Sequence, residues 1–162
     1  MRMALAVIMA LGALACPAQA AAGLERVKRY GVELDLDKYP QATPKDALAS
    51  VLKAIEYRKI DYLLAHLADP KYVDHRVQQV HGGKFEGMVE EVTDKLSNDP
   101  GAVKKLHQFL DEGAWETQEN TASVKFKEGT ERVYLRKIDN RWFFENQGRA
   151  KAEAKEAGAK EK

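Results

Sequence analysis

Residues 133–147, VYLRKIDNRWFFENQ, decide the fold class of this chain. Apolar and polar side chains alternate over residues 132–138 and again over residues 141–146, which is the period of a β-strand. Asp139 and Asn140 lie between the two runs and tolerate the left-handed backbone that a two-residue hairpin loop requires. The pattern predicts an antiparallel hairpin in which Ile138 faces Arg141.

This register sorts the side chains of the hairpin onto two faces, because side chains alternate across a sheet. One face is predicted to lie on the core, and it carries Val133, Leu135, Trp142 and Phe144. The other face is half polar and half aromatic, and it carries Tyr134, Arg136, Ile138, Phe143 and Glu145. We interpret this outer face as one on which helices pack while its charged ends reach solvent. A surface that binds a ligand or a partner is the alternative.

The strand period continues upstream of the hairpin as far as Gly113. One strand is predicted to open at Trp115, and a second covers residues 122–126, where apolar and polar residues alternate. Turns at residues 119–120 and 128–129 separate these strands from each other and from the hairpin. The C-terminal half is therefore predicted to form a roughly four-stranded antiparallel sheet.

Amphipathic helices are predicted to precede this sheet. The first follows Thr43, a predicted N-cap, with Pro44 at its first position and Asp46 at its third. Its buried face follows from the helical spacing i, i+3, i+4, i+7 of Leu48, Val51, Leu52 and Ile55. Further helices are predicted over residues 60–67, 85–96 and 100–112, the last with Val103, Leu106 and Leu110 facing inward and Gly113 at its end.

Residues 71–80 leave two structures open. Asp69 and Pro70 are typical of an N-cap and the first position of a helix, and Val73, Val77 and Val80 recur at helical spacing. These valines therefore support a helix. The β-branched side chains also suit a strand, so a strand remains the alternative.

Two stretches resemble the NTF2-like (cystatin-type cone) superfamily. They are residues 43–74, TPKDALASVLKAIEYRKIDYLLAHLADPKYVD, and residues 133–147, quoted above. The first is similar to the helix-loop-helix of small secreted members of the superfamily, and the second to their closing hairpin, with Trp142 where the last strand meets the core. The resemblance implies an α+β fold and an interior pocket. The known enzymes of that fold use Asp, His or Tyr side chains that point into the cone.

The N-terminus has the pattern of a bacterial export signal. Arg2 supplies a positive charge, residues 4–15 are apolar, and residues 18–20 read Ala-Gln-Ala, a small-x-small cleavage site. The apolar run is about half of the ~20 residues that a membrane-spanning helix needs. We expect cleavage after Ala20 and a secreted or periplasmic product. A lipoprotein anchored through Cys16 is the less favoured alternative.

The rest of the chain divides into three predicted parts. Residues 21–42 form an extended lead-in, residues 43–148 a single α+β domain, and residues 149–162 a charged flexible tail without large apolar side chains. Cys16 is the only cysteine, so cleavage after Ala20 would leave no thiol for a disulfide or a metal. No transmembrane span is predicted in the mature chain.

The charge balance argues against binding modes that depend on bulk charge. The chain has 26 basic and 25 acidic residues, and removal of Arg2 with the signal makes the two equal. Nucleic acid and an anionic membrane surface are therefore not predicted partners. The mean hydropathy is negative and 44% of residues are hydrophobic, which is typical of a globular chain.

No catalytic, cofactor-binding or metal-binding residue is assigned from the sequence, and no cofactor is predicted. His75 and His81 lie six residues apart, a spacing that does not place two ligands on one helical face. His66 and His107 are interpreted as residues at the boundary of the core. Asp74 and His75 are adjacent and point in different directions, so an acid/base pair would need other partners.

Gly82 and Gly83 suit a chain reversal, with an anion-binding nest of backbone N–H groups as the alternative.

Three hypotheses of function remain. The leading one is an exported non-catalytic domain that binds a protein partner or a small ligand in the bacterial cell envelope. The second is an NTF2-like small-molecule enzyme, an isomerase or a hydrolase, with Asp74 or His75 near a pocket. The third is a lipid-anchored envelope component, which depends on Cys16. The identity of the ligand or partner and the oligomeric state are not predicted.

Overall fold

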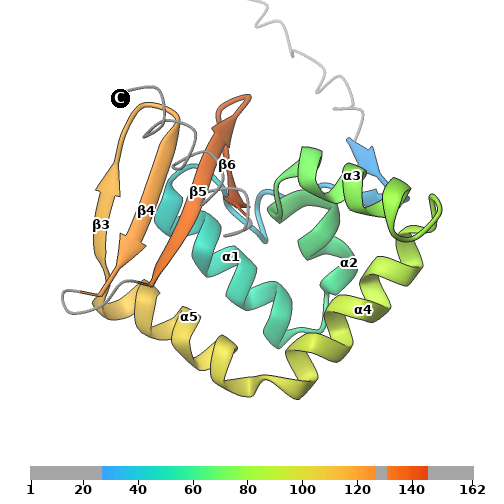
Figure 1. Ribbon diagram of the computed structural model, residues 1–162. Helices are drawn as coiled ribbons and strands as arrows, with labels where there is room; N and C mark the ends of the chain where they lie inside the picture. The colour runs from blue at the N-terminus through green and yellow to red at the C-terminus, as the bar shows by residue number, and fades with distance from the viewer. Residues whose placement is uncertain (1–26, 127–130, 146–162) are drawn as a thin grey trace, which may run out of the picture.

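The computed structural model describes residues 27–126 and 131–145. The predicted export signal, Cys16 and the charged tail lie outside these residues. The described chain is α+β, with helices in its N-terminal part and a four-stranded antiparallel sheet after them (Figure 1). This fold class is the one predicted from the sequence.

The described elements follow one another in a simple order. A two-stranded hairpin comes first, and its strands are β1 (Lys28–Arg29) and β2 (Val32–Glu33). The helices are α1 (Pro44–Glu56), α2 (Ile60–Tyr62), the π-helix η1 (Leu63–Leu67), α3 (Pro70–Gln79), α4 (Phe85–Asn98) and α5 (Pro100–Glu112). The strands of the sheet are β3 (Ala114–Thr117), β4 (Thr121–Lys125), β5 (Arg132–Ile138) and β6 (Arg141–Glu145).

The sheet confirms the predicted hairpin. Its strand order is β3-β4-β5-β6, and each neighbouring pair is antiparallel. Ile138 faces Arg141, and Leu135 faces Phe144. The loop residues Asp139 and Asn140 have φ angles of +48° and +61°, the left-handed values that a tight hairpin loop needs.

The caps predicted for the helices are also present. The Thr43 hydroxyl accepts a hydrogen bond from the N–H of Asp46, and the Asp46 carboxylate accepts one from the N–H of Thr43, so α1 begins with a capping box. Residues 70–79 are helical, which decides the open question between helix and strand. Val73 and Val77 are buried in this helix, whereas Val80 is 57% exposed. Val80 is the C-cap residue of α3.

Asp69 is the most deeply buried of these caps. Its Oδ1 accepts hydrogen bonds from the N–H groups of Lys71 and Tyr72 at 2.8 and 3.2 Å, and its side chain is almost fully buried. We expect Asp69→Ala to lower the free energy of unfolding by about 1–2 kcal/mol, because the first N–H groups of α3 lose their acceptor. Urea unfolding measures the loss, and Asp99→Ala, at the exposed cap of α5, is expected to lose less. An equal loss of unfolding free energy in the two variants would contradict the view that burial strengthens the Asp69 cap.

The inner face of the sheet packs on α1 and α5. This hydrophobic cluster contains Ala47, Leu48, Phe109, Ala122, Val124, Val133, Leu135 and Trp142. Three of the four predicted core residues of the hairpin belong to it, and Phe144 is partly buried against it. In α5 the predicted inward residues Leu106 and Leu110 are only half-buried, whereas Phe109, which the helical spacing did not select, is fully buried.

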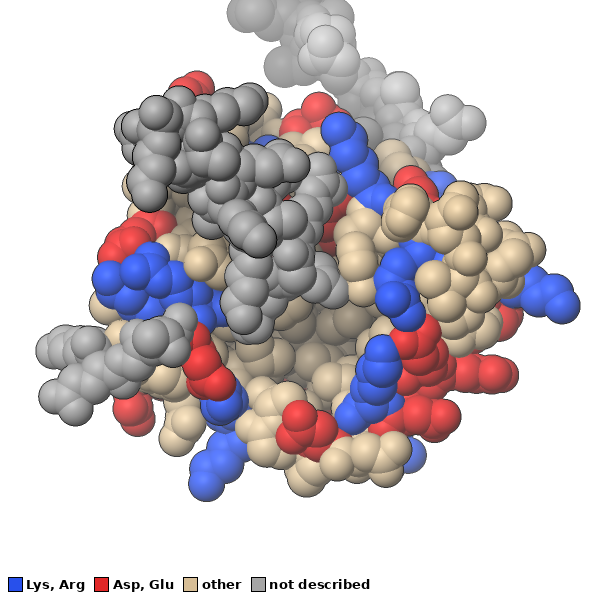
Figure 2. Space-filling model, in the orientation of Figure 1, with Lys and Arg blue, Asp and Glu red and all other residues tan. Residues whose placement is uncertain are grey.

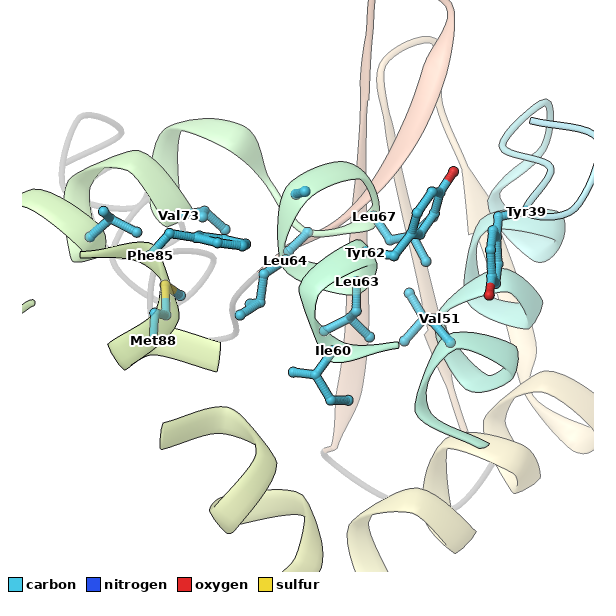
Figure 3. Close-up of a cluster of buried hydrophobic side chains, with 14 residues drawn as sticks. Tyr39, Val51, Ile60, Tyr62, Leu63, Leu64, Leu67, Val73, Phe85 and Met88 are labelled. Carbon is cyan, nitrogen blue, oxygen red and sulfur yellow. The ribbon is translucent and has the colours of Figure 1, made fainter. Parts of the chain in front are cut away.

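A second hydrophobic cluster fills the space between α1, the α2–η1 turn, α3 and α4 (Figure 3). Its largest members include Tyr39, Tyr62, Phe85 and Met88. Phe144 also contacts this cluster, so the two cores meet at the end of β6. The segment before α1 contributes to the core through Tyr39, which is 3% exposed.

The π-helix connects the helical part to the sheet. Gln41 is buried, and its Nε2 donates to the carbonyl of His66 in η1 and to the carbonyl of Trp142 in β6. The N–H of Trp142 in turn donates to the carbonyl of Gln41 at 3.0 Å. The N–H of Asp69 donates to the carbonyl of Phe144 at 2.9 Å. These bonds fix the position of edge strand β6 against η1.

The outer face of the hairpin is less accessible than a binding surface would be. Phe143 and Glu145 are 3% and 4% exposed, and Arg136 donates to Glu145 at 2.7 Å. The guanidinium of Arg141 lies 5.1 Å from the centroid of the Phe143 ring. Phe143 belongs to neither hydrophobic cluster, and α1 and α5 pack on the opposite face. The expectation that helices cover this face therefore finds no support in the described part of the chain.

Candidate functional site

Asp74, the first candidate for acid/base chemistry, holds the N-terminal hairpin in place. Its Oδ1 accepts hydrogen bonds from the guanidinium of Arg29 and from the hydroxyl of Tyr30. Arg29 also donates to the carbonyls of Ala65 and Pro70, at 2.8 Å each. The cation thus lies at the C-terminal end of η1, where unpaired helical carbonyls favour positive charge. These contacts give Asp74 a structural role.

His75 does not join Asp74 in a pair. It is exposed on α3, whereas the Asp74 carboxylate faces the N-terminal hairpin. The ring of Tyr30 stacks on Phe85 with 4.2 Å between the centroids, so the hairpin also contacts the start of α4. The structure therefore separates the two residues that the enzyme hypothesis uses.

The other histidines also make structural contacts. His66 is 2% exposed, so its interpretation as a boundary residue is wrong. Its Nε2 lies 2.9 Å from the carbonyl of Val32, and burial lowers the pKa of His66, which keeps the ring neutral at pH 7. His107 is half-buried and lies 3.1 Å from Glu56. His81 lies 2.9 Å from Glu91.

Glu91 is the centre of a charge cluster between α3 and α4. Arg76 donates to both of its carboxylate oxygens, at 2.8 and 2.9 Å, and Lys95 donates to one of them. The hydrogen bonds from Lys95 and then from Arg76 lower the pKa of Glu91 from its usual 4.5 to about 2. The cluster joins α3 to α4.

The depressed pKa of Glu91 predicts a pH dependence of stability. A carboxylate whose pKa is lower in the folded chain stabilises it above pH 4.5, and this contribution is lost as the pH falls toward 2. We expect Glu91→Gln to abolish that part of the acid destabilisation, while Glu90→Gln, at an exposed neighbouring position, leaves it intact. Urea midpoints measured above, within and below this pH window test the difference. Parallel pH profiles for the two variants would contradict it.

Gly82 and Gly83 form a chain reversal and not an anion-binding nest. Their φ angles are +58° and +83°, which favour glycine. The N–H of Gly83 donates to the carbonyl of Val77, and the N–H of Lys84 donates to the carbonyl of His81. The N–H groups of Gly83 and Lys84 are therefore already used by the backbone.

Residues 27–126 and 131–145 contain neither a metal-ligand cluster nor a membrane-spanning helix. No group of three or more His, Cys, Asp or Glu side chains lies close enough to hold a metal ion there. None of the helices in these ranges has both the length and the apolar character needed to cross a bilayer. Both acidic and basic side chains lie around the rim of the visible face (Figure 2), in keeping with the balanced charge of the sequence.

An arrangement of tyrosine and lysine side chains stands apart from these structural contacts. We call it the tyrosine–lysine cluster, and it consists of Lys38, Tyr39, Lys53 and Tyr57. The Lys38 and Lys53 ammonium nitrogens lie 5.5 and 5.7 Å from the centroid of the Tyr39 ring. The Lys38 nitrogen also lies 5.6 Å from the centroid of the Tyr57 ring. The cluster therefore combines two positive charges with two aromatic rings.

A third tyrosine, Tyr62, packs against the cluster from the core. Tyr62 in α2 stacks on Tyr39 with 4.2 Å between the centroids, and the two hydroxyls point in opposite directions (Figure 3). The Tyr62 hydroxyl donates to the carbonyl of Asp35 and accepts from its N–H. Burial raises the pKa of Tyr62, which keeps this hydroxyl protonated. The loop that carries Lys38 is thus held in one position.

The outer side of the cluster is open to solvent. Tyr57 is 61% exposed, and Leu36, two residues before Lys38, is 43% exposed. Both belong to the small set of large apolar side chains that the described surface exposes, whereas Tyr134 and Phe143 of the hairpin do not. An exposed ring beside an ammonium group can bind a ligand by stacking and by charge.

The sequence contains a partial signal for this cluster. Lys53 in α1 and Tyr57 at the C-cap of that helix are four positions apart, which places them on the same side of the helix. Lys38 and Tyr39 are adjacent in the segment interpreted as a lead-in, so nothing local connects them to α1. The stacking of Tyr39 on Tyr62 and the hydrogen bond from Lys53 to the carbonyl of Lys38 bring the two pairs together.

Comparison of the chain with protein-family models, with curated proteins and with solved structures found no match. The resemblance to the NTF2-like superfamily stays a prediction.

Proposed function

We propose that this chain is a non-catalytic domain of the bacterial cell envelope, and that it binds a small ligand or a partner through the tyrosine–lysine cluster. The observation that carries the proposal is the exposed ring of Tyr57 beside the ammonium groups of Lys38 and Lys53. The contacts of Asp74 support a binding role over an enzymatic one, because this carboxylate already accepts hydrogen bonds from Arg29 and Tyr30.

The location in the envelope rests on the pattern of residues 1–20. Export with cleavage after Ala20 is expected to give a mature N-terminus at Ala21, which N-terminal sequencing of the protein from its host detects. A lipidated N-terminus at Cys16 would instead establish the lipoprotein alternative. Retention of Met1 in a cytoplasmic fraction would contradict export.

Amide NMR spectra of residues 21–162, recorded with and without a mixture of small-molecule fragments, test the binding role. We expect shifts confined to residues 35–39 and 53–57. Shifts that gather around Asp74 would favour the small-molecule enzyme, and Asp74→Asn would then be the variant to assay. The absence of any localised shift would contradict the proposed ligand-binding surface.

A further inference from the structure

We infer that the tyrosine–lysine cluster binds a phosphate-type dianion carried on a molecule with an aromatic or apolar part. This inference rests on the proposed function, since it names the ligand class of the same surface. The cluster has two positive charges without acidic partners in the described part of the chain. Lys38 and Lys53 place two ammonium groups near one tyrosine ring, and neither makes an ion pair with an acidic side chain of the described residues.

The two ammonium groups lie on the same side of the ring. Tyr62 covers one face of Tyr39, with 4.2 Å between the ring centroids. The opposite face is therefore the one over which the nitrogens of Lys38 and Lys53 lie. Two like charges repel, and a ligand with two negative charges between them would reverse the sign of that interaction.

The backbone contacts of the two lysines favour a preformed site. Lys53 donates to the carbonyl of Lys38 at 2.9 Å, so its ammonium group is held beside the loop. The carboxylate of Asp35 in the same loop accepts from the N–H of Lys38 at 2.9 Å. The Asp35 carboxylate thus stabilises the backbone of the loop, and an anion does not have to displace it from either ammonium group.

The aromatic side chains define the rest of the ligand. The Tyr57 ring is exposed and lies next to the Lys38 ammonium group, so it can stack on a planar group attached to the anion. A phosphate monoester of an aromatic alcohol combines these properties.

Calorimetric titration of residues 21–162 with inorganic phosphate and with phenyl phosphate at low ionic strength tests the inference. We expect saturable binding of both and tighter binding of phenyl phosphate. Lys38→Met and Lys53→Met are each expected to weaken binding about tenfold, the loss of one charge-assisted contact. Lys104→Met removes an exposed lysine of α5 and is expected to change nothing.

One substitution and one pH series distinguish the contribution of the aromatic ring from that of the phosphate. Tyr57→Ala is expected to weaken phenyl phosphate but not inorganic phosphate, because only the first has a ring to stack. Binding of phenyl phosphate is expected to strengthen from pH 5 to pH 7.5, since the second pKa of a phosphate monoester is about 6. Equal affinities of Lys104→Met, Lys38→Met and Lys53→Met would overturn the inference.

The phosphate could belong to a small molecule or to a lipid headgroup, and sedimentation with vesicles distinguishes the sources. Phosphatidic acid vesicles carry a phosphate monoester on a lipid. Sedimentation of the wild-type chain but not of Lys38→Met with these vesicles would place the group on a lipid. Binding of phenyl phosphate without vesicle binding would place it on a small molecule. If neither phosphate nor vesicles bind while fragments still shift residues 35–39, the inference fails and the proposed function stands. If fragments do not bind either, both fail.

Discussion

Replacement of Phe109 by alanine is expected to lower the free energy of unfolding by about 3–5 kcal/mol, the usual range for removing a buried aromatic ring. Phe109 is 2% exposed and is the one side chain of α5 that lies fully within the cluster under the sheet. Its ring also stacks on Phe126 with 4.2 Å between the centroids. Its removal would leave a cavity between α5 and the sheet, because close-packed surroundings relax only in part.

Urea unfolding followed by tryptophan fluorescence measures this loss, since Trp142 belongs to the same cluster. Phe109→Leu should lose much less, because most of the volume remains. Gln108→Ala, at the exposed neighbouring position, is expected to lie within about 0.5 kcal/mol of the wild type. A loss of less than about 1 kcal/mol for Phe109→Ala would show that the contact between α5 and the sheet is not a packed core.

Gly113→Ala is the second substitution with a large expected effect, about 3 kcal/mol or more of destabilisation. A Cβ atom at residue 113 would lie 2.2 Å from Cγ2 of Val124 and 2.3 Å from the carbonyl oxygen of Phe109. The first contact is a side chain of the packed sheet, and the second is backbone, so neither can move away freely. The φ angle of Gly113 is −70°, so the need for glycine comes from space and not from a left-handed backbone.

Gly101→Ala supplies the matched control, because Gly101 lies in the first turn of the same helix. A Cβ atom there would meet only the Asp99 carboxylate, at 3.3 Å. Alanine loses less backbone entropy than glycine in a helix, so Gly101→Ala is expected to be neutral or stabilising by up to about 1 kcal/mol. Thermal unfolding of the two variants compares them directly. Similar shifts of the two midpoints would contradict the close approach of α5 to β4.

Local patterns predicted most of the fold. The alternation over residues 132–146 predicted the pairing of Leu135 with Phe144, because the loop length and the period of two leave one register. The Thr43 cap and the helical spacing after it predicted α1, since both act within a few residues. The burial of Phe109 was not predicted. Helical spacing indicates which face of a helix is apolar, but it does not indicate how deeply the neighbouring elements cover each residue of that face.

The candidate site was not predictable in this way. Lys38 and Tyr39 lie in a segment without clear periodicity. They meet Lys53 through tertiary contacts, the stacking of Tyr39 on Tyr62 and the hydrogen bond from Lys53 to the carbonyl of Lys38. Asp74 was a reasonable catalytic candidate by residue type. Its partners Arg29 and Tyr30 are more than forty residues away in the chain, so its structural role depends on a contact that no local pattern encodes.

The amino-acid sequence by itself determined that helices precede a four-stranded sheet, the register of the closing hairpin and the caps of α1 and α3. It did not predict the hairpin of β1 and β2, and it left α3 open between helix and strand. The predicted features follow from interactions between residues close in the chain, whose strength depends on backbone geometry and side-chain period. Only the tertiary structure decided that Gln41 joins η1 to β6 and that two lysines converge on one tyrosine ring. The reason is that such contacts form between distant segments, and packing of the whole core selects which of them meet.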